Sequence, residues 1–126
     1  MAGSDLASRP RHNEVEVSVF GPGYGECVVL HLTNNQWIII DSCLGMGSKQ
    51  PSALEYLSSL NVDLANDVRL VLATHYHDDH IAGIGELFEK CKTARFACSM
   101  GAKQRRLDEA DRDIPQLPSY GRIWSR

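Results

Sequence analysis

Alternation of apolar and polar residues near the start of the chain predicts a β-strand. Over residues 14–19, Val15, Val17 and Val19 fall on one side, and polar residues fall on the other. This period of two is typical of a half-buried strand. A glycine-rich stretch at 21–25 follows and predicts a turn that ends the strand.

Two apolar runs after this turn predict a β-hairpin. The runs cover residues 27–32 and 37–40, and Asn34 and Asn35 lie between them. Consecutive asparagines between apolar runs are typical of a tight hairpin turn. The second run stops at Asp41, where a glycine-containing loop begins.

Helices and strands are expected to alternate in the rest of the chain. Leucines at helical spacing predict a helix over 53–60, with Ser52 as its capping residue. Further apolar spacing predicts strands at 68–73 and 93–97 and helices at 84–91 and 102–111. The fold class expected from this alternation is α/β.

Length and composition indicate one globular domain. The chain has 126 residues, 43% hydrophobic and 23% charged, which excludes a disordered tail, a collagen-like fibre or a coiled coil. Residues 1–13 are polar and without periodicity, so we expect a flexible N-terminal arm before a domain over 14–126.

Charge and cysteine usage limit the expected partners and location. A net charge of −3 gives no reason to expect nonspecific binding to nucleic acid or to an anionic membrane. Because there is no run of 18 apolar residues and no secretory signal, we expect no membrane association. Four cysteines without a C-x-x-C pair are typical of a reducing compartment, so the expected location is the cytoplasm.

The residues that indicate a particular chemistry form the pattern His75-x-His77-x-Asp79-His80. In an extended segment His75 and His77 share a face and can hold one metal ion, while Asp79 and His80 can serve a second. Imidazole and carboxylate suit Zn²⁺, Mn²⁺ or Fe, and we expect two divalent ions, with zinc preferred. Chance alone gives such a pattern with a probability on the order of 5 × 10⁻⁴ in a chain of this composition. The alternative is a polar loop that happens to be rich in histidine.

Residues 74–83 (THYHDDHIAG) resemble the metal-binding signature of the metallo-β-lactamase superfamily. Within it, the sequences GECVV at 25–29 and IIDS at 39–42 are similar to the branch that includes the hydrolase domain of DNA-uptake competence proteins and related bacterial defence-associated hydrolases. The resemblance covers about residues 14–100 and implies the N-terminal half of an αββα sandwich, so the expected domain is a partial, apparently truncated one.

The resemblance also implies a role for each site residue. His75 and His77 would bind the first metal, Asp79 and His80 the second, and Asp79 would be catalytic by orienting the attacking water. Asp41 matches the acidic residue at the end of the family's strand. It is expected to hold a metal-bound histidine or to tie two loops together. A turn-capping aspartate is the alternative reading of Asp41.

The chain departs from the family pattern after His80. The family completes its site with two further histidines and a bridging aspartate, but no histidine follows His80 in this sequence. Half of a sandwich should also leave one sheet face uncovered. Three explanations stay open: a piece of a longer hydrolase, a site completed by a partner or a second copy, and a relative that no longer catalyses.

The function implied is metal-dependent hydrolysis by a metal-bound hydroxide. The expected substrate is a phosphodiester or another anionic ester, as a small molecule, a nucleotide or a nucleic acid. The alternative function is a non-catalytic metal-binding or protein-interaction module derived from this fold. For two other candidates we expect a structural role rather than a chemical one. His31 is expected to be a packed strand residue, and Cys43 a small buried residue.

Overall fold

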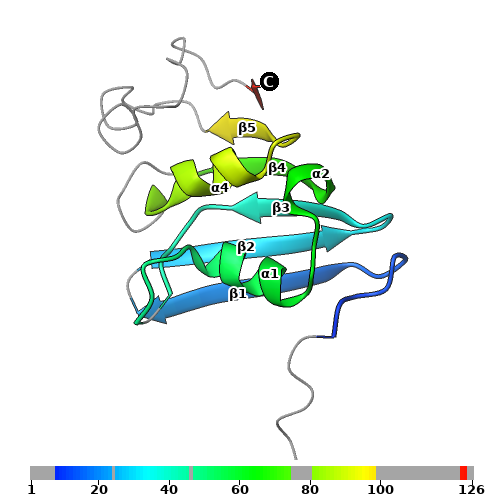
Figure 1. Cartoon of the computed structure of the whole chain (residues 1–126), viewed down its shortest axis with the longest axis horizontal. Coiled ribbons are helices and arrows are strands. Elements are labelled where there is room, and N and C mark those ends of the chain that lie inside the picture. Colours follow the sequence, from blue (N-terminus) through cyan, green and yellow to red (C-terminus); the bar gives the residue numbers. More distant parts are fainter. Residues whose placement is uncertain (1–7, 24, 46, 75–80, 99–122, 125–126) are drawn as a thin grey trace, which may run out of the picture.

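The computed structural model describes residues 8–23, 25–45, 47–74, 81–98 and 123–124. In this part of the chain, one six-stranded sheet has helices on one of its faces (Figure 1). The elements, in chain order, are β1 (Glu16–Gly23), β2 (Gly25–Leu32), β3 (Gln36–Ile40), α1 (Ser52–Ser59), α2 (Leu64–Asp67), β4 (Val68–Ala73), α4 (Ile84–Lys90), β5 (Arg95–Cys98) and β6 (Ile123–Trp124). The predicted α/β class is confirmed, with one sheet layer and one helix layer of the expected sandwich.

The sheet is mixed, and its parallel part positions the site. Strands β1, β2 and β3 are antiparallel neighbours, β3, β4 and β5 run parallel, and β6 pairs antiparallel with β5. The carboxyl ends of neighbouring parallel strands meet at the same edge of a sheet. Asp41 and Thr74, which follow β3 and β4, therefore lie side by side.

The predicted hairpin is confirmed as β2 and β3. Asn34 and Asn35 have φ angles of 64° and 54°, both in the left-handed region. A two-residue turn of this kind matches the twist of the strands it joins, and asparagine tolerates the conformation.

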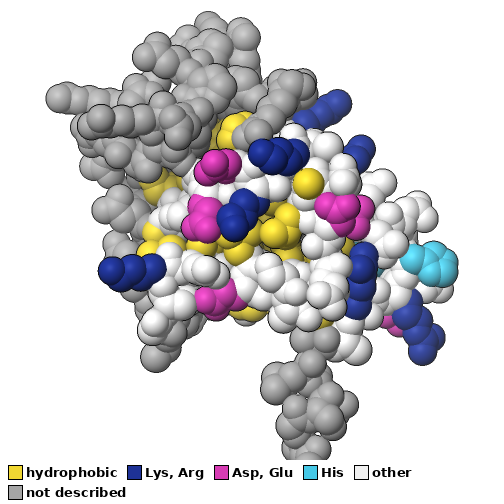
Figure 2. Space-filling model, in the orientation of Figure 1, with side chains coloured by type: hydrophobic (Ala, Val, Ile, Leu, Met, Phe, Trp, Pro, Cys, Tyr) yellow, Lys and Arg dark blue, Asp and Glu magenta, His cyan; other side chains and the backbone are white. Residues whose placement is uncertain are grey.

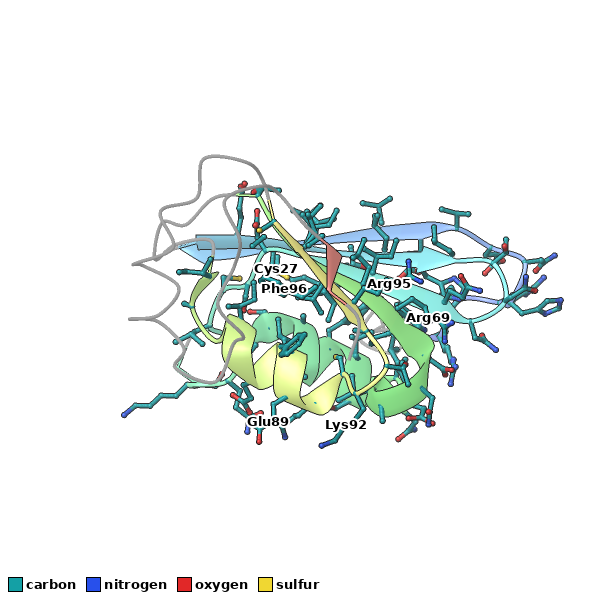
Figure 3. The ribbon with its side chains drawn as sticks, turned by 90° about the horizontal axis from the view of Figure 1, so that it is seen from above. Cys27, Arg69, Glu89, Lys92, Arg95 and Phe96 are labelled. Carbon is teal, nitrogen blue, oxygen red and sulfur yellow. The ribbon has the colours of Figure 1, made fainter. Side chains whose placement is uncertain are left out.

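The hydrophobic core lies between the sheet and the helices. Every second strand residue points to the helices, and those residues are buried, as the burial pattern of β2 and β3 shows. In Figure 3, Cys27 and Phe96 lie between the layers, whereas Glu89 and Lys92 extend from the outer side of the helix layer. Figure 2 views that outer side and shows acidic and basic side chains interspersed on it.

The half-buried strand predicted over 14–19 is present as β1, but its valine side is the exposed one. Val17 and Val19 are 61% and 70% exposed. The other side faces Tyr56 of α1, whose ring lies 5.1 Å from that of Phe20, measured between centroids. The Tyr56 hydroxyl donates to the Glu16 carboxylate. Polar strand residues are therefore half-buried because α1 offers them a hydrogen-bonding partner.

The start of α1 differs from the expectation. Ser52 does not cap the helix, because Pro51 occupies the capping position and Ser52 is the first helical residue. Ser52 is also buried, and its hydroxyl accepts a hydrogen bond from the Cys43 thiol at 3.6 Å. Proline fits this position because its fixed φ is compatible with the start of a helix.

Two elements were not predicted, and one prediction lies outside the described residues. Helix α2 is only four residues long, and Asp63 caps it by accepting from the Asn66 N–H at 3.2 Å. Strand β6 has two residues. The helix expected at 102–111 is not among the described residues.

The described part of the N-terminal arm contacts the domain. A guanidinium nitrogen of Arg9 lies 3.7 Å from the Asp67 carboxylate, and the carbonyl of His12 accepts from the Asn34 N–H at 2.7 Å. Among the helices that the structure describes, none is long and apolar enough to cross a membrane.

Replacing Tyr56 by phenylalanine should cost about 1–2 kcal/mol of unfolding free energy, because the hydroxyl that donates to Glu16 and accepts from Ser18 is lost while the ring contact with Phe20 remains. Burial and the bond to Glu16 raise the pKa of Tyr56 above its usual 10. The folded state therefore favours the protonated phenol, and stability should be full below pH 10 and fall as the pH rises through the higher folded-state pKa. Urea unfolding at several pH values tests this, and an equal alkaline loss in Y56F would contradict it.

Replacing Gly83 by alanine should destabilise the protein by about 2–4 kcal/mol. Gly83 has a φ of +79°, and a Cβ added there would lie 2.7 Å from Pro51 Cγ. Gly47 provides a matched control, since its φ is +74° but nothing lies within 4 Å of an added Cβ. G47A should cost only about 1 kcal/mol, which is the backbone strain alone. Equal losses in urea unfolding would show that the contact with Pro51 is unimportant.

Candidate metal centre

Asp41 ends β3 and holds the first residue after β4. Its carboxylate accepts two hydrogen bonds from Thr74, from the backbone N–H at 2.7 Å and from the hydroxyl at 2.5 Å. The Asp41 N–H donates to the Leu72 carbonyl at 2.7 Å. Asp41 is buried, and its φ of 60° is one that aspartate tolerates better than most residues. Asp41 therefore ties together the ends of two neighbouring parallel strands.

Ser42, the next residue, bonds to the chain just after the segment 75–80. Its hydroxyl donates to the Ala82 carbonyl at 2.6 Å, and Ser42 and Ile81 form an isolated parallel β-bridge. Ser42 is fully buried, so this hydrogen bond does not compete with water.

These contacts fix both ends of the segment 75–80. Thr74, immediately before it, is bound by Asp41, and Ile81 and Ala82, immediately after it, are bound by Ser42. Two adjacent residues of one loop thus hold the entry and the exit of the segment that carries the motif. The contacts agree with the expectation that Asp41 ties two loops together.

The four expected metal ligands, His75, His77, Asp79 and His80, lie outside the described residues. Within the ranges that are described, no three histidine, cysteine, aspartate or glutamate residues lie close enough to hold a metal ion. The imidazoles and the carboxylate of the motif are donors that suit zinc and similar ions.

Thiols lie beneath this end of the sheet but are poor metal ligands. Burial, the neighbouring Cys43 and the Asp41 carboxylate raise the pKa of Cys27 to about 12. Cys27 is therefore a neutral thiol at physiological pH, and the thiolate is the form that binds metals or acts as a nucleophile. Cys43 is 1% exposed, as expected for a small buried residue.

His31 belongs to the core at the opposite end of β2. It is fully buried, and its Nδ1 lies 2.8 Å from the Glu14 carbonyl, so Nδ1 carries the proton that it donates. Its ring packs against that of Trp37, with 4.6 Å between centroids. The interpretation of His31 as a packed strand residue is confirmed.

Three residues around the site have roles that the sequence did not predict. Thr74 and Ser42 supply hydroxyl donors, and Gly83 allows α4 to begin close to Pro51. A signal exists for each: Thr74 directly follows a buried strand, Ser42 follows the aspartate that ends another, and Gly83 directly precedes an apolar helix. Their partners lie about 30 to 40 residues away in the sequence, so no local pattern identifies them.

Comparison with known proteins gives one family. The family model described as the metallo-beta-lactamase superfamily matches residues 20–124. Neither the curated proteins nor the solved structures include a significant match. Because the matched range covers most of the chain and contains the β3 and β4 ends, the motif and α4, this chain belongs to the metallo-beta-lactamase superfamily, whose fold is that of metal-dependent hydrolases.

Proposed function

We propose that the chain provides the first half of a two-metal hydrolase site. His75 and His77 hold one divalent cation, and Asp79 and His80 hold the other. Zinc is the proposed metal because three imidazoles and a carboxylate are donors that it prefers, while Mn²⁺ or Fe would accept the same set. These four residues leave each ion short of a complete set of protein ligands, and no histidine follows His80 in this sequence.

The observation that carries this proposal is the double anchoring of the motif by Asp41 and Ser42. A metal site needs its ligands held in one arrangement, and supporting hydrogen bonds around the ligands commonly supply that order. Here the segment begins beside a buried carboxylate and ends beside a buried hydroxyl. A histidine-rich surface loop without function would not need hydrogen bonds from buried polar groups. A buried carboxylate or hydroxyl lowers the stability of the fold whenever its hydrogen-bond partner is lost.

The proposed reaction is hydrolysis of a phosphodiester or another anionic ester. A bound pair of divalent cations supplies Lewis acidity, which favours deprotonation of water and neutralises negative charge on the substrate. Asp79 is the proposed catalytic residue, and its carboxylate orients the attacking water by accepting a hydrogen bond from it. Asp41 contributes by fixing Thr74, the residue that precedes the first ligand.

The proposed location is the cytoplasm. All four cysteines are free thiols in the structure, and Cys27, Cys43 and Cys91 are buried in it. A core that uses cysteine as a small hydrophobic residue is typical of proteins from a reducing compartment.

A second candidate function is a non-catalytic interaction module that keeps the fold. The observation that favours it is the apolar sheet face opposite the helices, where Val17 and Val19 are largely exposed. The two candidates differ in what depends on the motif: a hydrolase loses its activity with His77, whereas an interaction module associates equally well without it.

Replacing His77 by alanine should lower zinc binding, because one of the two ligands of the first ion is lost. Equilibrium dialysis against zinc, with the bound metal measured by elemental analysis, should show at least one ion fewer per chain than in the wild type. His12→Ala is the matched control, since His12 is exposed and far from the motif in sequence, and it should bind as much zinc as the wild type. Equal zinc binding by H77A and the wild type would contradict the assignment.

Replacing Asp41 by asparagine separates the two interpretations of this residue. Asparagine tolerates the same backbone conformation, and its amide oxygen can still accept from the Thr74 N–H. Its amide nitrogen must donate to the Thr74 hydroxyl, which reverses that hydrogen bond, so the substitution removes the negative charge and one acceptor. If Asp41 supports the ligands electrostatically, zinc affinity should fall about 10–100-fold.

Ser42→Ala is the matched comparison for this test. It removes the bond to the Ala82 carbonyl without changing the charge, and should cost about 1 kcal/mol of unfolding free energy. Its effect on zinc affinity should be smaller than that of D41N. Unchanged zinc affinity in D41N would show that Asp41 acts only as a structural tie.

A further inference from the structure

Two buried polar atoms near the β2–β3 turn have no hydrogen-bond partner. They are Nε2 of His31 and Nε1 of Trp37, and they are the two such side-chain atoms in the part of the chain that the structure describes. Both side chains are fully buried. Buried polar groups in folded proteins are nearly always paired, so two exceptions in neighbouring residues need an explanation.

The two residues lie against each other in the core. His31 on β2 is opposite Trp37 on β3 in the antiparallel pairing, and both belong to the buried, helix-facing side of their strands. Their ring centroids are 4.6 Å apart, and the ring planes are inclined by 55°. The two unpaired nitrogens therefore belong to one place in the core rather than to two.

The hydrogen bond on the other side of the His31 ring determines what each nitrogen can do. Nδ1 of His31 lies 2.8 Å from the Glu14 carbonyl oxygen, which can only accept, so Nδ1 carries the proton. A neutral imidazole with its proton on Nδ1 has a lone pair on Nε2, which accepts. The indole N–H of Trp37 can only donate. This place in the core thus offers one donor and one acceptor.

The donor and the acceptor do not satisfy each other. A bond from the Trp37 indole to His31 Nε2 is the pairing that their chemistry allows, but the two atoms do not meet the distance and angle of a hydrogen bond. Leaving both unpaired in a medium of low dielectric constant costs free energy twice. A molecule that accepts from one atom and donates to the other removes both costs.

We propose that this place is a binding site for a single water molecule that bridges the two rings. The water accepts from the Trp37 indole N–H and donates to His31 Nε2. An ion does not suit the site, because the indole N–H repels a cation and the lone pair of Nε2 repels an anion. Water is neutral, small enough for a core and able to donate and accept at once, as buried waters in proteins do.

The strand pairing is irregular beside the site. Trp37 pairs with Val68 of β4, but the next residue, Ile38, pairs with Leu70, so Arg69 has no residue opposite it on β3. An extra residue of this kind disturbs the ladder and bends the strand locally. Regular packing is therefore interrupted next to Trp37, where a water molecule can be accommodated in an otherwise close-packed core.

The bridge completes a chain of hydrogen bonds from the N-terminal arm to β3. The chain runs from the Glu14 carbonyl through the His31 ring and the water to the Trp37 indole. The arm is also bonded to the hairpin turn, where the Asn34 N–H donates to the His12 carbonyl. The site lies at the end of β3 away from Asp41 and does not depend on the proposed metal chemistry.

Nuclear magnetic resonance of the isotope-labelled chain tests the site without a substitution at it. The sequence has two tryptophans, and Trp124→Phe identifies which indole N–H signal belongs to Trp37. The Trp37 indole proton should exchange slowly with solvent. It should also show a nuclear Overhauser effect to water with the sign typical of a molecule that stays bound. Nε2 of His31 should have the chemical shift of an unprotonated ring nitrogen.

His31→Phe tests whether His31 holds the water. Phenylalanine keeps an aromatic ring beside Trp37 but removes the acceptor, so the effect from water at the Trp37 indole should disappear. His12→Phe is the matched control, because His12 is exposed, and it should leave the effect unchanged. Circular dichroism shows whether both variants fold, and if H31F does not, the measurements on the unsubstituted site decide.

Three results would overturn the proposal. The first is a Trp37 indole proton that shows no effect from water in the wild type. The second is a proton on Nε2 of His31, because that nitrogen could then no longer accept from the water. The third is an effect of the same sign and size in folded H31F, since the water would then be bound without the histidine.

Discussion

The hydrogen bonds between the Asp41 carboxylate and Thr74 are the interaction on which the arrangement of the site depends. They join the ends of β3 and β4, and the next residue, Ser42, adds the bond to Ala82 on the other side of the motif. A single loop after β3 therefore determines where the segment 75–80 leaves the sheet and where it returns. Because these groups are buried, loss of either partner leaves a polar atom without compensation, which makes the arrangement stiff as well as specific.

A second constraint is that the helices of the described part of the chain all lie on one face of the sheet. That side buries the hydrophobic core, while Val17 and Val19 on the other face are largely exposed. Strand β1 shows how the two faces differ. Its polar residues face α1, where the Tyr56 hydroxyl bonds to them, and its valines lie on the opposite face. The loop that holds the two ends of the motif thus lies at one edge of this sheet.

Local sequence patterns predicted the elements well and the contacts between them poorly. The hairpin at Asn34 and Asn35, the buried strand β4 and the helix α4 follow from turn chemistry and periodicity, and the structure contains all three. The orientation of β1 could not be predicted, because alternation alone does not say which side is covered; a tyrosine 40 residues away decides it. The start of α1 was missed because Ser52 is a typical capping residue, whereas the structure places Pro51, which has no capping side chain, at that position. Asp41 was identified from the sequence, but its partner Thr74 depends on the parallel pairing of β3 and β4.

We propose that a metal ion bound to this chain is held by the imidazoles of the motif rather than by the four cysteines. X-ray absorption spectroscopy of the zinc-loaded chain tests this most directly, because the two kinds of ligand differ in distance and in scattering. We predict a shell of nitrogen and oxygen at about 2.0–2.1 Å with the multiple scattering of histidine rings. A sulfur shell at about 2.3 Å, or a zinc ion surrounded by water alone, would contradict the assignment.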